Sequence, residues 1–245
     1  MRIFKNFTEA EGEIKRDLKE MGVRIEANRM QDKSGDFTTL ELVNYGFTVL
    51  EPDIEHLRPT MPWAEVEWVE RRRGINGNPV NPGKSWLQRR NLWEEFLEID
   101  RLPLPPKTGV PNSFDIPGCS LQLAYTYPER FAMNSQVRKV ISELRKNPFS
   151  RQLFVSMWDP HTDIDRIGHR RVPCSLGWHF ILRNGKLHIT YTMRSCDFIN
   201  HWANDCWLTI VLLKYVAKEA NYEVGQFCQF INSFHVYEQD VSEVF

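Results

Sequence analysis

The sequence lacks an excess of charge of either sign, and it lacks any long apolar run. Its 31 lysines and arginines nearly balance its 32 aspartates and glutamates, leaving a formal net charge of −1. Without a strong positive field the chain is a poor candidate for binding nucleic acid, although a local phosphate site is compatible with it. No apolar stretch approaches the ~20 residues of a transmembrane helix, so no membrane partner is expected.

Cysteines are few, and they form no recognisable metal or redox motif. The five cysteines are an odd number without a CxxC pair, and no apolar signal-peptide region follows Met1. This combination predicts a reducing, cytoplasmic compartment. The acidic and histidine-containing segment "HTDIDRIGH" (161–169) matches no standard zinc or calcium spacing, so we expect a solvated loop and no metal.

Length and composition fit one domain. The chain has 245 residues, 42% of them apolar, and it shows no internal repeat or low-complexity tract. Prolines concentrate between residues 79 and 117, around one helix-like segment at 85–99, and they predict loop rather than a linker. We therefore expect residues 1–245 to form a single domain.

Helical and alternating apolar patterns occur together along the chain. Helical spacing predicts helices over 7–22, 135–148 and 208–221, whereas alternation predicts strands over 36–52 and 151–158. The fold class is therefore α+β, with a largely antiparallel sheet covered by long helices.

The clearest local signal is a pair of alternating runs around Asn184-Gly185, in "WHFILRNGKLHITYTMR" (178–194). Asn-Gly is a preferred dipeptide of two-residue turns, so the runs predict a β-hairpin. In the second strand, one face carries Leu187, Ile189, Tyr191 and Met193, and the other carries His188, Thr190, Thr192 and Arg194.

Cys174, in "VPCSLGW", is a candidate nucleophile because a thiolate is a strong one. A lone cysteine is, however, more often a small buried apolar residue. The predicted hairpin brings Arg194 beside the Cys174 segment, and an adjacent cation lowers the pKa of a thiol. Such a contact would favour the nucleophile.

Three acidic residues are also of interest, and each of them has a purely structural interpretation. Asp205 precedes the apolar face of the 208–221 helix, with Asn204 as the expected N-cap, so it fits a first-turn acid that complements the helix dipole. Glu65 and Glu67, beside Trp68, fit either a general acid/base pair in an apolar pocket or an exposed helix face.

Several longer segments together resemble the thymidylate synthase family, and within it the phage deoxycytidylate hydroxymethylases. The matching segments are "ISELRKNPFSRQLFVSMWDP", "VPCSLGWHFILRNGKLHITYTMRSCD", "AND" and "EVGQFCQFINSFHVY", in the order and spacing of that family. Before residue 136 the resemblance is patchy: "QDKSGDFTTLELVNYGFTVLEP" resembles the phosphate loop and first strand, "EVEW" the catalytic-glutamate helix, and "AYTYPERF" the active-site tyrosine segment.

The resemblance implies a thymidylate synthase-like fold, a sheet-mediated homodimer and a reaction. The implied enzyme is a dCMP 5-hydroxymethylase that takes a one-carbon unit from 5,10-methylenetetrahydrofolate, located in the host cytoplasm if it is phage-encoded. A dCMP C5-methyltransferase and a dUMP-directed synthase or hydroxymethylase are the alternatives of the same class. A nucleotide-binding regulatory relative without catalysis is the alternative of another class.

The resemblance also implies roles for individual residues. The expected catalytic residues are Cys174 as the nucleophile at pyrimidine C6, Glu65 for water and proton movement, Tyr125 for proton removal at C5, and Asp205. The expected substrate-binding residues are Lys33, Arg194, Ser195 and the partner subunit's Arg151 for the phosphate, and His235 and Tyr237 for the sugar hydroxyl. Asp197 and Trp68 are the expected folate contacts.

The residue at position 205 bears on whether the substrate is dCMP or dUMP. Thymidylate synthases resemble one another in having asparagine at the position of Asp205, and the asparagine side chain accepts from uracil N3–H and donates to O4. A carboxylate only accepts, which suits the amino group of cytosine and favours a protonated N3. A protonated N3 withdraws electrons from C6 and eases attack by Cys174. The resemblance therefore implies recognition of cytosine.

The chain departs from the family pattern in three places. Arg151 is followed by Gln152 where two adjacent arginines are usual, and Ser175 and His179 replace the usual residues after the nucleophile. Eight residues follow Tyr237, where relatives continue into a strand and a tail that closes over the folate. A more open site would admit water, which favours hydroxymethylation over methylation.

Overall fold

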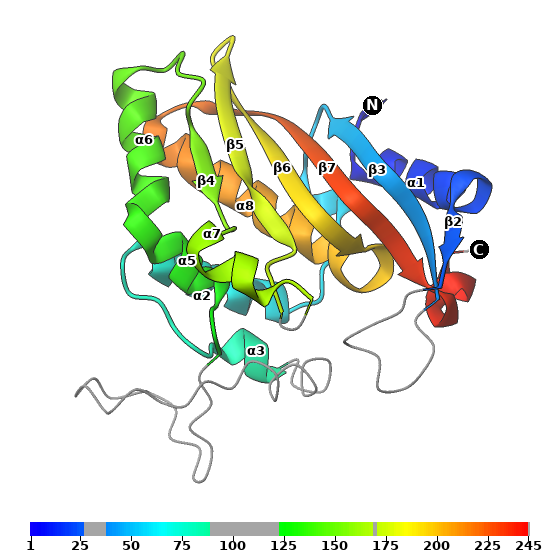
Figure 1. Ribbon diagram of the computed structural model, residues 1–245. Helices are drawn as coiled ribbons and strands as arrows, with labels where there is room; N and C mark the ends of the chain where they lie inside the picture. The colour runs from blue at the N-terminus through cyan, green and yellow to red at the C-terminus, as the bar shows by residue number, and fades with distance from the viewer. Residues whose placement is uncertain (27–37, 89–122, 169–170, 245) are drawn as a thin grey trace.

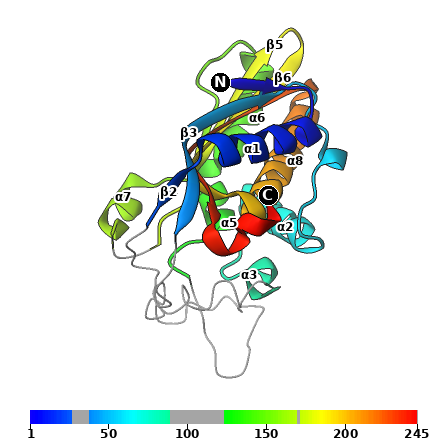
Figure 2. The same cartoon turned by 90° about the vertical axis from the view of Figure 1, so that its right-hand side faces the viewer.

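A mixed seven-stranded sheet with helices against one of its faces forms the centre of the molecule (Figure 1). The computed structural model describes residues 1–26, 38–88, 123–168 and 171–244. The strand order is β1-β3-β7-β6-β5-β4, and β2 pairs with β3. Figure 2 shows the sheet nearly edge-on, with α1 and α8 on the same side of it.

Most of the helices and strands lie where the sequence patterns predict them. The strands are β1 Arg2–Phe4, β2 Val23–Ile25, β3 Thr39–Val49, β4 Phe154–Ser156, β5 Ser175–Arg183, β6 Lys186–Asp197 and β7 Glu223–Tyr237. The helices are α1 Phe7–Met21, α2 Trp63–Ile75, α3 Lys84–Gln88, α5 Tyr127–Ala132, α6 Gln136–Lys146, α7 Pro160–Asp163 and α8 Ala203–Ala220. Of the helix expected over 85–99, the structure describes only residues 85–88, which lie within α3.

The β5–β6 hairpin confirms the turn predicted at Asn184-Gly185. Both residues have positive φ, 52° and 75°, as a type I′ turn requires. The alternation along β6 is also confirmed, since Tyr191 and Met193 are buried against the helices while Thr192 is half-buried on the other face. The hairpin therefore presents one polar face at the open side of the sheet.

Two strand pairs in the sheet are parallel, β1 with β3 and β6 with β7, and the other four pairs are antiparallel. The expectation of a largely antiparallel, mixed sheet is therefore confirmed. A parallel pair needs a crossover connection, and α8 supplies it between β6 and β7. Because α8 packs on the sheet and against α2 and α6, it is buried on nearly all sides.

The start of α8 differs from the prediction, since Asn204 is not its N-cap. A π-helical turn, Phe198–Trp202, runs directly into α8, and Asp197 caps that turn by accepting from the backbone N–H groups of Ile199 and Asn200, each at 3.0 Å. Asn204 instead accepts from the Thr60 N–H at 2.7 Å. The helix-start signal is therefore Asp197, a favoured N-cap residue type seven positions before Asn204. Asp205 does lie in the first turn.

None of the helices in the described ranges has the length and apolarity needed to cross a lipid bilayer.

Helices α2 and α5 approach closely at Gly74. A Cβ atom at Gly74 would lie 2.0 Å from the carbonyl oxygen of Pro128, the second residue of α5. This contact sets how near the α2 side chains come to Tyr127, the first residue of α5.

Gly74→Ala is therefore expected to lower the free energy of unfolding by roughly 1–3 kcal/mol through overpacking, although alanine is the better helix former. Gly12→Ala is the matched control, because Gly12 is exposed in the middle of α1 with nothing within 4 Å of an added Cβ. The control should raise stability by roughly 0.5–1 kcal/mol. Urea unfolding of both variants measures the difference, and equal effects at the two positions would contradict the close α2–α5 contact.

Candidate active site

Cys174 and Arg194 come together where β5 begins and β6 ends. The Arg194 guanidinium donates from Nε to Pro173 O and from Nη2 to Val172 O, both at 2.9 Å, and Nη2 lies 3.5 Å from Cys174 Sγ. The Arg194 backbone N–H also donates to Cys174 O at 2.9 Å. A guanidinium held by two carbonyls against a half-buried thiol is an arrangement that activates nucleophilic cysteines.

A bulge follows Cys174 and turns the next side chain inward. Ser175 pairs with Met193 but Gly177 pairs with Thr192, so one residue of β5 is extra. Ser175 is buried, and its Oγ lies 2.5 Å from the hydroxyl of Tyr191.

Tyr127 is the second tyrosine beside the nucleophile. Its hydroxyl oxygen accepts from Ser175 N–H at 3.4 Å. Burial and then the neighbouring Cys174 raise the pKa of Tyr127, while burial and then Asp205 raise the pKa of Tyr191. Both phenols therefore stay protonated at neutral pH, and their hydroxyl groups can donate hydrogen bonds.

Asp205 faces the same cluster from the first turn of α8. The Cys196 thiol lies 3.8 Å from Asp205 Oδ2, and it donates to that oxygen. Burial and then Asp205 raise the pKa values of Cys196 and Cys206 well above the ordinary thiol value. These two thiols therefore stay protonated at neutral pH.

Glu67 and Arg71 form a buried ion pair on α2. Arg71 donates to Glu67 Oε1 from Nε at 2.8 Å and also from Nη2. The two side chains are 12% and 3% exposed. The guanidinium lies over the ring of Tyr127, 4.9 Å from its centroid. Burial lowers the pKa of Arg71, but its neighbours, Glu67 first among them, raise it by more, so Arg71 remains a cation.

Glu65 lies on another side of α2. It is exposed, and it lines a groove together with Val69, Arg73 and Lys84. Two residues correspond to about 200° around a helix, so Glu65 and Glu67 point in nearly opposite directions. The structure does not bring Glu65 to Cys174, whereas Glu67 pairs with Arg71, whose guanidinium lies over Tyr127.

Trp68 also points away from the nucleophile. Its ring packs edge-on against Tyr215 of α8, with ring centroids 5.9 Å apart. Tyr215 follows Asp205 by ten residues, or about 15 Å along the helix. Trp68 is thus placed in the packing between α2 and α8 rather than in the folate site expected for it.

Tyr125 is buried beneath arginines. The guanidinium groups of Arg130, Arg166 and Arg171 lie 4.8, 5.6 and 5.5 Å from its ring centroid. Tyr127, two residues later, is the tyrosine that contacts the residue after Cys174.

The end of β7 brings His235 and Tyr237 beside the end of β6. In the parallel register Ser195 pairs with Ser233 and Asp197 pairs with His235. The His235 and Tyr237 rings meet edge to face with centroids 5.3 Å apart, and His235 Nδ1 lies 3.3 Å from Ser233 Oγ. These residues and Arg194 therefore share one end of the sheet.

Asp197 is buried, and it holds the turn before α8. Besides the two backbone N–H groups at Oδ1, Asn200 Nδ2 donates to Oδ2 at 2.9 Å. A carboxylate oxygen accepts two hydrogen bonds, so Oδ2 has capacity for one N–H of a pterin. Asp197 therefore fits a folate contact.

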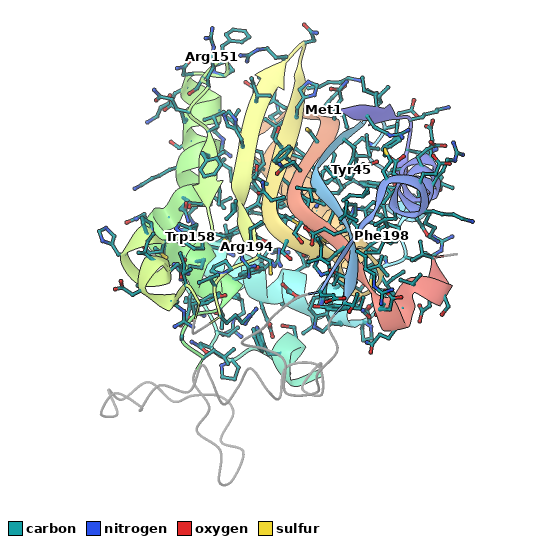
Figure 3. All side chains as sticks on the ribbon, turned by 45° about the vertical axis from the view of Figure 1, so that its right-hand side comes forward. Met1, Tyr45, Arg151, Trp158, Arg194 and Phe198 are labelled. Carbon is teal, nitrogen blue, oxygen red and sulfur yellow. The ribbon has the colours of Figure 1, made fainter. Side chains whose placement is uncertain are left out.

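Arg151 and Lys33 complete the residues expected at the site. Figure 3 shows Arg151 and Arg194 at opposite ends of the sheet. His179 Nε2 lies 2.9 Å from Arg151 O, and His179 is five strand residues, or about 17 Å, from Cys174. Arg151 is thus far from the nucleophile of its own chain. Lys33 lies outside the described residues.

Two sequence signals indicate why Glu67 and Tyr127, rather than Glu65 and Tyr125, lie near the Cys174 segment. Ala64, Glu67, Arg71 and Gly74 recur on one face of α2, which is the face that packs inward. Thr126 and Glu129 form a capping box, so Tyr127 begins α5. Helical phase and the cap together indicate Glu67 and Tyr127.

Comparison with known proteins agrees with this geometry. A thymidylate synthase from Mycoplasma pneumoniae is 32% identical over 109 residues, which is 44% of this chain and 37% of that protein. A deoxyuridylate hydroxymethyltransferase from Pseudomonas phage M6 is 33% identical over 137 residues, 54% of this chain and 38% of that protein. The chain covers between 22% and 54% of the length of the first curated relatives that it matches.

A solved structure, the thymidylate synthase from T4 phage, superposes with a TM-score of 0.66 over 95% of this chain and 77% of the other. At 19% sequence identity this likeness establishes the fold. The family model for thymidylate synthase matches residues 85–245, about two thirds of the chain. The chain therefore belongs to the thymidylate synthase family.

Proposed function

We propose that the protein is a dCMP 5-hydroxymethylase. It adds a one-carbon unit from 5,10-methylenetetrahydrofolate to C5 of dCMP, and water becomes the hydroxyl oxygen. The observation that carries the proposal is the carboxylate of Asp205 within the cluster that contains Cys174, Tyr127 and Tyr191. A carboxylate at this position suits a base with an exocyclic amino group.

Cys174 starts the reaction by adding its thiolate to C6 of the pyrimidine. The C5=C6 double bond breaks, and its electron pair makes C5 nucleophilic. The folate, when bound, supplies a carbon at the oxidation level of formaldehyde for C5 to attack. Loss of the C5 proton then breaks the bond between the transferred carbon and the folate nitrogen, so that tetrahydrofolate leaves and an exocyclic methylene remains on the base. Water adds to this methylene, and Cys174 departs as C5=C6 forms again. The enzyme needs no reductant for this outcome.

Asp205 recognises the base. Its oxygens accept from the 4-amino group and from a protonated N3, and its charge favours that protonated form. The same charge is mismatched with O4 of uracil. Asp205 thereby assists the attack by Cys174, because a protonated N3 draws electrons from C6.

Glu67 and Tyr127 move protons near C5 in this proposal. Glu67 takes the role that the resemblance gives to Glu65, because Glu67 reaches the cluster through Arg71 and Tyr127. Tyr127 stays a neutral phenol, so it donates a hydrogen bond to a water that removes the C5 proton.

The remaining residues bind the phosphate, the sugar and the folate. Arg194, Ser195 and Lys33 hold the 5′-phosphate in this proposal, together with the partner subunit's Arg151. His235 and Tyr237 lie at the same end of the sheet as Arg194 and bind the sugar hydroxyl. Asp197 receives a pterin N–H at Oδ2.

A dUMP-directed hydroxymethylase is the second candidate. The relative from Pseudomonas phage M6 is a deoxyuridylate hydroxymethyltransferase, which supports hydroxymethylation but with the other base. Asp205 is the residue that favours dCMP over dUMP in this chain.

The proposed activity is tested by product analysis. Incubation with dCMP and methylenetetrahydrofolate should give a base heavier by one CH2O unit, and dUMP should react at least about tenfold more slowly. Mass spectrometry of the base separates the hydroxymethyl from the methyl product. Cys174→Ala should form neither product while still binding dCMP, since phosphate and base contacts do not need the thiol. A methylated base, or full activity of Cys174→Ala, would contradict the proposal.

Asp205→Asn should shift the preference from dCMP toward dUMP. The amide keeps the size of the side chain, supplies a donor for O4 and removes the charge that favours a protonated N3. A mismatched buried hydrogen bond costs about 1–3 kcal/mol, so the ratio of kcat/KM values should change by roughly tenfold or more. Steady-state kinetics with both nucleotides measure it. An unchanged ratio would reduce Asp205 to a helix-terminal charge.

A homodimer formed through the open face of the sheet is part of the proposal. Phe154 and Phe230 are 49% and 36% exposed, and they share this face with His179 and Thr192. Such a patch suits a second copy. The position of Arg151, far from its own Cys174, also suits a site completed by the partner.

Arg151→Ala and Cys174→Ala should complement each other. Each variant alone should be inactive, but a mixture should recover up to about a quarter of wild-type activity, because hybrid dimers contain one intact site. The measurement is activity after subunit exchange, with exchange verified by a mass tag on one variant. A mixture that exchanges subunits without recovering activity would argue against the shared site.

A further inference from the structure

Arginines hold the backbone of the four residues that end at the nucleophile. In this nucleophile segment, residues 171–174, the carbonyl oxygens of residues 172–174 accept hydrogen bonds from Arg194. The first carbonyl oxygen, that of Arg171, accepts from Nε of Arg166 at 2.7 Å. Each carbonyl of the segment therefore accepts a hydrogen bond from an arginine, and two arginines from different parts of the chain share the task.

Arg166 reaches the segment from a buried position. It ends a short 3-10 turn, Ile164–Arg166, and it is 8% exposed. Its guanidinium lies 5.6 Å from the centroid of the buried Tyr125 ring, within the range in which an aromatic face attracts a cation. A hydrogen bond from a charged donor is also stronger than one between neutral groups. The ring and the carbonyl together therefore hold the Arg166 side chain in place.

We propose that Arg166 is a positioning residue for the nucleophile: by holding the carbonyl oxygen of Arg171, it fixes the segment that presents Cys174 to Arg194. The inference rests on the proposed function only for the role of Cys174. The contact that depends on the segment is the 3.5 Å between Cys174 Sγ and Arg194 Nη2. A displacement of about 1 Å at a reacting group can cost roughly a hundredfold in rate, so one hydrogen bond at the start of the segment has a large effect.

The same hydrogen bond fixes where the Arg171 side chain begins. The Arg171 guanidinium lies 4.5 Å from the ring centroid of Trp86, on α3, and 5.5 Å from that of Tyr125. Burial is the main cause of the raised pKa of Tyr127, and the positive charge of Arg171 opposes that rise. Arg166 therefore helps to place a second group, the Arg171 cation, near the phenol that contacts the residue after the nucleophile.

Arg166→Met is the main test, because methionine fills much of the same volume without a charge or a donor. The kcat for the nucleotide should fall at least about tenfold, while its KM should stay within about threefold, because Arg166 orients the nucleophile and is not among the residues proposed to bind the nucleotide. Arg166→Lys keeps the charge and a donor but lacks the planar guanidinium, so it should recover part of kcat. Steady-state kinetics of the three proteins measure both constants.

Tyr45→Phe is the matched control for a loss of stability alone. The Tyr45 hydroxyl donates to the buried Asp17 carboxylate at 2.6 Å, and Figure 3 shows Tyr45 well away from Arg194. The control should unfold more easily than the wild type but keep its kcat and KM. An unchanged kcat in Arg166→Met, a change confined to KM, or an equal loss of kcat in Tyr45→Phe would overturn the inference. If Arg166→Met does not fold, Arg166→Lys carries the comparison, and a wild-type kcat in Arg166→Lys would overturn it.

Hydrogen exchange separates this inference from the proposed function, because it needs no turnover. The backbone N–H of Arg194 donates to Cys174 O, and that of Ser175 donates to the Tyr127 hydroxyl, so both report on the nucleophile segment. In Arg166→Met both should exchange at least about tenfold faster than in the wild type, as measured by NMR, and in Tyr45→Phe they should not. If the wild type converts neither nucleotide, the proposed function fails, and faster exchange still supports the positioning role. Unchanged exchange in Arg166→Met would contradict that role whatever the kinetics.

Discussion

The parallel pairing of β6 with β7 is the constraint on which the site depends. Parallel neighbours cannot be joined by a tight turn, so the chain must cross over, and α8 is that crossover. The pairing brings Ser195 and Asp197 beside Ser233 and His235, while the crossover directs Asp205 back toward the sheet. One strand pair therefore positions the proposed phosphate, sugar and base contacts together.

Buried charge is the second organising feature of the site. Taking a carboxylate and a guanidinium out of water costs several kcal/mol for each ion, so the Glu67–Arg71 pair adds little net stability. Removing one partner would nevertheless cost about 3–5 kcal/mol, because the other charge would stay buried and unpaired. What the pair supplies is a fixed carboxylate position, which the proposed proton transfer near C5 would use.

Much of the fold and part of the site were predictable from sequence. Alternation and the Asn184-Gly185 turn predicted the hairpin, and the hairpin alone brought Arg194 toward Cys174, as the structure shows. On α5 and α2 the structure brings Tyr127 next to Ser175, and Arg71 with Glu67 next to Tyr127, where the resemblance implied Tyr125 and Glu65. A two-residue error in a helix changes the face by about 200°, so a motif match such as "EVEW" identifies the helix without identifying the side chain that enters the site.

The sequence by itself determined the local elements of this protein, because strand alternation, helix periodicity and turn residues act over a few positions. It also identified Cys174 as the candidate nucleophile, Arg194 as its neighbour and Asp205 as the acid at the start of α8. Tertiary structure decided that Glu67 pairs with a buried Arg71 beside Tyr127, and that a π turn rather than Asn204 begins the crossover helix. These outcomes depend on contacts between distant segments, such as Gly74 against Pro128, and no local pattern records the distance between two helices.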